Sequence, residues 1–158
     1  MKFNYSAFKA IYLHEMDRFR RTLLQSLLSP VLSTSLYFIV FGSVIGGYVE
    51  KIDGISYGSY IVPGLLMLTL LTQSITNTSF GIFFPKFNGT IYEILAAPIS
   101  TFEIVLAFVG AGASKTLLVG IVIFITATFF VEVDVKYPLL VFFLLILVAF
   151  TFALFGFL

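Results

Sequence analysis

Four long stretches of this chain carry no formal charge, and they constrain its fold more than any other feature. They cover 28, 32, 16 and 22 residues, at positions 22–49, 54–85, 116–131 and 137–158. A helix needs about 20 mostly apolar residues to span a bilayer, and the uncharged run 104–114 extends the third stretch backward to that length. The stretches lack the alternating polarity of the strands of a membrane barrel. With 11% charged and 59% hydrophobic residues, the chain could not cover a soluble fold with polar groups. These features predict an all-α integral membrane protein.

The pattern predicts four transmembrane helices preceded by one amphipathic helix. The four are expected at about residues 30–49, 61–82, 104–131 and 138–158. The amphipathic helix is expected over residues 6–28, where apolar side chains recur every three or four residues at Phe8, Tyr12, Met16, Phe19, Leu23 and Leu27. Such spacing places them on one arc of about 100°. This segment is either an interfacial helix lying along a leaflet or a plain basic anchor.

The distribution of Lys and Arg predicts a cytoplasmic N-terminus. With that end inside, six positive residues lie on the cytoplasmic side and two outside, leaving Lys115 aside. Positive residues near the ends of spanning helices favour the cytoplasm. The segments 50–59 and 132–137 then face outward, and the loop 85–103 is cytoplasmic.

Two groups of polar residues fall inside the predicted spans. Thr69, Thr72, Gln73 and Thr76 share one face of the second span, and we expect that face to point inward, because polar groups in lipid need protein or water as partners. The face either makes interhelical hydrogen bonds or lines a polar path. Lys115 either snorkels to the cytoplasmic interface or faces a conduit or a partner helix.

Several site classes are excluded. The segment VGAGASKT over residues 109–116 looks like a phosphate loop, but Val109 and Ser114 occupy its glycine positions. Its small residues, four apart at Gly112, Thr116 and Gly120, instead favour close helix packing. A tetrahedral Cys/His zinc site is excluded, since the chain has one histidine and no cysteine. The net charge of +1 indicates no field for nucleic acid.

The cytoplasmic loop 85–103 contains signals for a short helix. Residues 92–96 could form one or two helical turns that stop before Pro98. Ser100 and Glu103 have the spacing of a capping box at the start of the third span.

Four blocks of sequence resemble the membrane subunits of ABC-2 type ABC transporters. They are HEMDRFRRTLLQSLLSP, STSLYFIVFGSVIGG, YIVPGLLML and PKFNGTIYEILAAPIS. The resemblance implies a half-transporter of six spanning helices with a cytoplasmic amphipathic helix. It also implies a second permease copy, as a homodimer or heterodimer, and a separate ATPase subunit that docks on the loop after the second span. Four of the six spans are present, and the chain stops inside an apolar run, so we expect a C-terminally truncated sequence.

We therefore expect the permease subunit of an ATP-driven exporter in a bacterial cytoplasmic membrane. It would have no catalytic residue, cofactor or metal of its own, and its substrate could be an amphiphile, a glycan or a drug-like molecule. Tyr92 and Glu93 are the expected contacts to the ATPase, with Pro98 holding the turn; alternatively, Tyr92 packs on lipid headgroups and Glu93 is solvated. A non-ATP secondary transporter and a nontransporting membrane anchor are the alternative functions.

Overall fold

The long elements of the described chain are all helices, as its uncharged stretches predict. The computed structural model describes residues 3–45, 51–52, 55–131 and 135–158. The helices are α1 (Tyr5–Arg21), α2 (Leu23–Tyr37), its π-helical continuation η1 (Phe38–Ile45), α3 (Tyr57–Asn88), α4 (Ile91–Ala96), α5 (Thr101–Phe130) and α6 (Pro138–Phe157). Strands β1 (Lys51–Ile52) and β2 (Ile55–Ser56) form a minimal antiparallel pair. Within the described residues, four segments are long and apolar enough to cross a membrane: Leu23–Phe41, α3, α5 and α6.

The N-terminal segment is two helices rather than the single helix expected over residues 6–28. Helix α1 ends at Arg21, and Thr22 has φ −109° and ψ 16°, outside the helical range. The Thr22 hydroxyl donates to the carbonyls of Arg18 and Phe19 at 3.2 and 3.3 Å, which satisfies acceptors that a continuing helix would have used. The first apolar span therefore begins at Leu23, before the expected residue 30. Its expected end at residue 49 lies outside the described residues.

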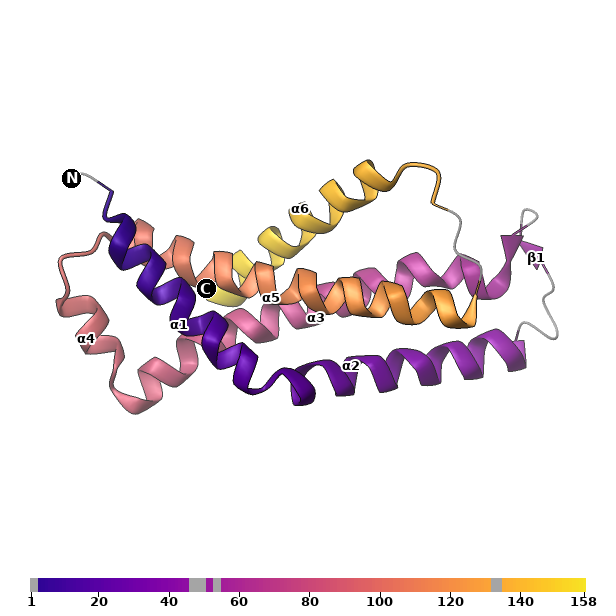
Figure 1. Ribbon diagram of the computed structural model, residues 1–158, viewed down its shortest axis with the longest axis horizontal. Coiled ribbons are helices and arrows are strands. Elements are labelled where there is room, and N and C mark those ends of the chain that lie inside the picture. The colour runs from indigo at the N-terminus through magenta and orange to yellow at the C-terminus, as the bar shows by residue number, and fades with distance from the viewer. Residues whose placement is uncertain (1–2, 46–50, 53–54, 132–134) are drawn as a thin grey trace.

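Helix α5 is the centre of the bundle and packs against α1, α2, α3 and α6. Figure 1 shows α1 crossing the first half of α5, with α4 and the β1–β2 pair at opposite ends of the molecule. The small residues expected to permit close packing lie between α5 and α3. A Cβ added at Gly120 would lie 2.7 Å from Leu70 Cδ2, and one added at Gly112 would collide with the Thr78 hydroxyl. Helix α6 approaches α3 in the same way at Gly156, where a Cβ would lie 2.5 Å from the Ile75 carbonyl oxygen.

The connection from α3 to α5 has well-defined ends. Gly89, with φ 78°, ends α3 in the left-handed conformation that glycine adopts without a steric penalty. The capping box predicted at the start of α5 is confirmed: Glu103 N donates to Ser100 Oγ, and Ser100 N donates to Glu103 Oε2 at 2.8 Å. Between these caps, α4 forms the short helix that the loop sequence predicts.

Candidate functional sites

The polar residues of α3 lie on two sides of the helix with different surroundings. On the packed side, Ser74 Oγ donates to the Ala149 carbonyl at 2.6 Å and Ser79 Oγ donates to the Gly156 carbonyl at 2.8 Å. Both acceptors belong to α6. These serines, which the sequence did not single out for this role, hydrogen-bond α3 to α6.

The face containing Thr69, Thr72, Gln73 and Thr76 does not point into the bundle, contrary to our expectation. Thr72 and Thr76 are exposed, and Thr69 and Gln73 are partly buried. The side of α3 that meets the bundle is instead occupied by Leu66, Leu70, Ser74 and Thr78, which recur every four residues and are buried. The Thr69 and Thr72 hydroxyls donate to carbonyls of their own helix, those of Leu65 and Leu68.

Three of these four residues line a pocket between α3 and α2. Its volume is about 230 Å³, and its lining is Ser29, Pro30, Ser33, Thr34, Tyr37, Leu65, Leu68, Thr69, Thr72 and Gln73. Thr76 lies outside that lining. Both helices thus contribute hydroxyl groups and apolar side chains to the lining, and no charged side chain is among the described residues that line it.

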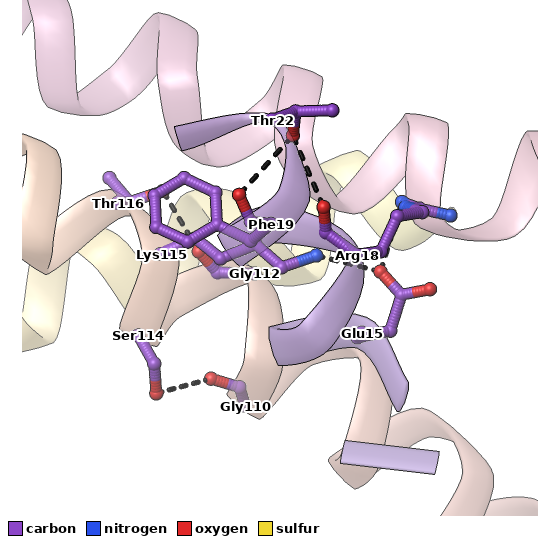
Figure 2. Close-up of polar contacts among 9 residues, drawn as sticks. All are labelled: Glu15, Arg18, Phe19, Thr22, Gly110, Gly112, Ser114, Lys115 and Thr116. Carbon is purple, nitrogen blue, oxygen red and sulfur yellow. Dashed lines mark hydrogen bonds and ion pairs between the residues drawn. The ribbon is translucent and has the colours of Figure 1, made fainter. Parts of the chain in front are cut away.

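Lys115 is paired with the N-terminal helix. Its Nζ donates to Glu15 Oε2 at 2.7 Å, and Arg18 Nη2 contacts the same oxygen at 2.9 Å. Figure 2 shows Glu15 and Arg18 of α1 and Lys115 of α5 converging. Lys115 is 3% exposed and Glu15 2%. Lys115 does not line the pocket, and the helix that it faces is α1.

Sequence reasoning missed Glu15. A signal was present, because Tyr12, Glu15 and Phe19 are separated by three and four residues and so share one side of a helix. A cation inside an apolar segment needs an acidic partner, and Glu15 lies on the side of α1 that contains Phe19.

Further contacts hold α1 to α5 on either side of this ion pair. The Tyr12 hydroxyl donates to Ser114 Oγ at 2.9 Å, and Asn4 N donates to Glu103 Oε1 at 2.5 Å. Beyond Glu15, Phe19 joins a buried cluster with Leu70 of α3 and Val119 of α5. Helix α1 is thus packed against the bundle along most of its length.

The residues expected to contact an ATPase lie on the outer face of the α3–α5 connection. Tyr92 is 73% exposed, and Glu93 and Pro98 are also exposed. On the inner face, Ile94 and Ile99 pack against a cluster formed by Ile82, Ile104 and Phe108. The connection therefore exposes polar and aromatic side chains on its outer face, while its inner face is packed against α3 and α5.

Comparison with known proteins establishes the family. The family model described as ABC-2 type transporter matches residues 6–158. Curated relatives include the inner membrane transport permease YadH of Escherichia coli strain K12, of Escherichia coli O157:H7 and of Shigella flexneri. Each is 39% identical over 150 residues, which cover 95% of this chain and 59% of the relative. No solved structure matches the chain significantly. The chain belongs to the ABC-2 type transporter family, and it spans about 59% of the length of these relatives.

Proposed function

We propose that this chain is the permease part of an ATP-driven exporter in a bacterial cytoplasmic membrane. The observation that carries the proposal is the family match over residues 6–158 of a chain with four helices able to span a bilayer. The N-terminus and α4 face the cytoplasm in this proposal, which agrees with the excess of positive residues on that side. The permease has no ATPase site of its own and works with a separate ATPase subunit.

The ATPase docks on the exposed face of α4. Tyr92 and Glu93 provide an aromatic group and a charge, two contact types that contribute strongly at small interfaces. Support comes from their exposure and from the anchoring of α4 through Ile94 and Ile99. A force applied to Tyr92 would reach α3 and α5 through that packed cluster, and Pro98 holds the turn into α5.

The pocket between α2 and α3 is part of the substrate path. Its hydroxyl-bearing and apolar lining suits an amphiphilic, glycan or drug-like substrate, with Thr69, Thr72 and Gln73 as hydrogen-bonding partners. Thr76 lies one turn further along the same helix face. A second permease copy completes the path, and the large exposed leucines of α2 leave an apolar surface for lipid or for that copy.

Copurification tests this function. In the natural protein, Tyr92→Ala and Glu93→Ala should preserve membrane insertion but reduce recovery of the ATPase and substrate-stimulated hydrolysis. Tyr137→Ala is the matched control, since Tyr137 is 72% exposed and lies at the start of α6, outside the α3–α5 connection. Wild-type recovery and hydrolysis for both loop variants would refute the coupling role.

A secondary transporter is the second candidate, because one observation favours it. Such transporters use charged groups inside the membrane, and the Glu15–Lys115 pair is buried. The pair lies between α1 and α5, however, and the pocket between α2 and α3. Transport into membrane vesicles that continues without ATP, and stops when the proton gradient is removed, would favour this candidate instead.

A further inference from the structure

We propose that Glu15 and Lys115 are positioning residues whose ion pair holds α1 and α5 together as one rigid unit during the transport cycle. This inference rests on the proposed function for its role in transport, but the geometry concerns this chain alone. In this proposal Lys115 fixes the position of α1 on α5, so that α1 moves together with the central helix of the bundle.

The position of the pair within the bilayer makes it costly to separate. Phe130, the end of α5, is 15 residues beyond Lys115, a distance of about 22 Å along a helix. Taking Phe130 as the outer end of the span and a hydrocarbon layer about 30 Å thick, we place Lys115 within the cytoplasmic part of that layer. An unpaired charge there is strongly disfavoured, so Lys115, whose acidic partner is Glu15, resists moving away from α1.

The pair lies where three helices meet. Helix α3 contributes Gly81, at which an added Cβ would lie 3.5 Å from Glu15 Oε2. The Arg18 guanidinium contacts the same Glu15 oxygen and stands 5.7 Å from the centre of the Phe84 ring on α3. Glu15 therefore accepts from both cations, and its carboxylate lies close to the α3 backbone at Gly81.

A continuous set of contacts joins this junction to α4. Ile94 of α4 packs in the cluster of Ile82, Ile104 and Phe108, and Ile11 of α1 joins the same cluster. Ile11 lies four residues before Glu15, so it is one helical turn away on the same side of α1. Movement of α4 would reach α1 through Ile11, and the ion pair would then keep α1 in register with α5.

Removal of both charges tests the proposal without leaving a charged Lys115 buried beside a neutral partner. Arg18 loses its contact with the Glu15 carboxylate, but it is partly exposed. The double variant Glu15→Gln/Lys115→Met replaces the pair by neutral side chains of similar size, a change that proteins often tolerate. Spin labels on cysteines at Arg20 of α1 and Leu118 of α5 report the helix separation, since both positions are exposed and the chain has no cysteine. The natural protein is measured with its ATPase, nucleotide-free and trapped with ATP.

With the native pair, the distribution of distances between the two spin labels should have one narrow peak at the same distance in both states. The double variant should broaden that distance and lower substrate-stimulated hydrolysis about tenfold relative to basal hydrolysis. Asp17→Asn is the matched control, because Asp17 is an exposed acid on α1, and it should change neither quantity. Tyr12→Phe removes the hydrogen bond to Ser114 at the same interface and should leave the distance narrow.

Two results would overturn the proposal. One is a native distance that changes between the two states, and the other is a double variant with a narrow distance and wild-type stimulation. If the double variant does not insert, Lys115→Met alone is subject to the same criteria, because Glu15 keeps Arg18 as its partner. A wild-type permease that binds no ATPase would refute the proposed function, while the nucleotide-free distance would still test the ion pair.

Discussion

The contact between α1 and α5 and the facing surfaces of α2 and α3 both bring polar side chains to apolar helices, but they use them differently. At the first, polar atoms bond from one helix to the other, as in Glu15–Lys115 and Tyr12–Ser114. At the second, the Thr69 and Thr72 hydroxyls bond to their own backbone and a pocket separates the helices. The comparison indicates that polar side chains hold two of these helices together only where their hydrogen bonds cross from one helix to the other.

Removal of one member of the ion pair should have the largest effect on stability, and the two single variants should differ. Glu15→Gln leaves Lys115 buried without an acidic partner, which we expect to cost about 3–5 kcal/mol. Lys115→Met should cost clearly less, because Glu15 retains Arg18. Thermal unfolding of the purified protein in detergent measures both. Equal losses for the two variants would show that Arg18 does not support Glu15.

The close approach of α6 to α3 should tolerate no added methyl group. Gly156→Ala places a Cβ against the backbone of Ile75, which cannot yield as a flexible side chain could, and should destabilise the protein by about 1–3 kcal/mol. Gly64→Ala is the control on α3, where a Cβ has open space. It should be neutral or slightly stabilising, because alanine favours helix. A neutral Gly156→Ala would mean that the two helices are further apart than described.

Substitutions on the two sides of α3 should have different effects, one on stability and the other on transport. Ser74→Ala removes a bond to the Ala149 carbonyl and should lower stability by about 1 kcal/mol or less. Thr72→Val removes no interhelical bond, so its effect on stability should be smaller, but it should alter transport if the pocket carries substrate. Thr151→Val is the matched control, because Thr151 is exposed and its hydroxyl also bonds four residues back, to Leu147. Equal transport in both threonine variants would remove the pocket from the substrate path.

The sequence predicted which segments form helices better than it predicted which side of each helix packs against its neighbours. Uncharged length predicted the apolar helices, and local hydrogen-bonding rules predicted the cap at Ser100 and Glu103. The side of α3 that packs could not be predicted, because lipid is as apolar as a protein interior and hydrophobic spacing does not distinguish them. The break at Thr22 could not be predicted from residue type, because the Thr22 hydroxyl bonds to the Arg18 carbonyl and Thr69 makes the same bond four residues back within the continuous helix α3.

The candidate sites divide in the same way. The exposure of Tyr92 and Glu93 follows from their place in a charged loop between spans, and the structure agrees with it. The sequence indicates which side of α1 carries Glu15, but it does not indicate that this side meets Lys115, which lies 100 residues further along the chain. The pairing depends on how α1 crosses α5, which is set by tertiary packing.

Cysteine labelling tests most directly the central claim, that the end of the molecule with α1 and α4 faces the cytoplasm. Ser56, Asn88 and Lys136 are exposed positions in a chain without cysteine, so each can carry a single new thiol. In intact cells of the producing strain, an impermeant thiol reagent should label Ser56→Cys and Lys136→Cys, and should label Asn88→Cys only after the membrane is opened. Labelling of Asn88→Cys in intact cells would contradict the orientation, and with it the docking of an ATPase on α4.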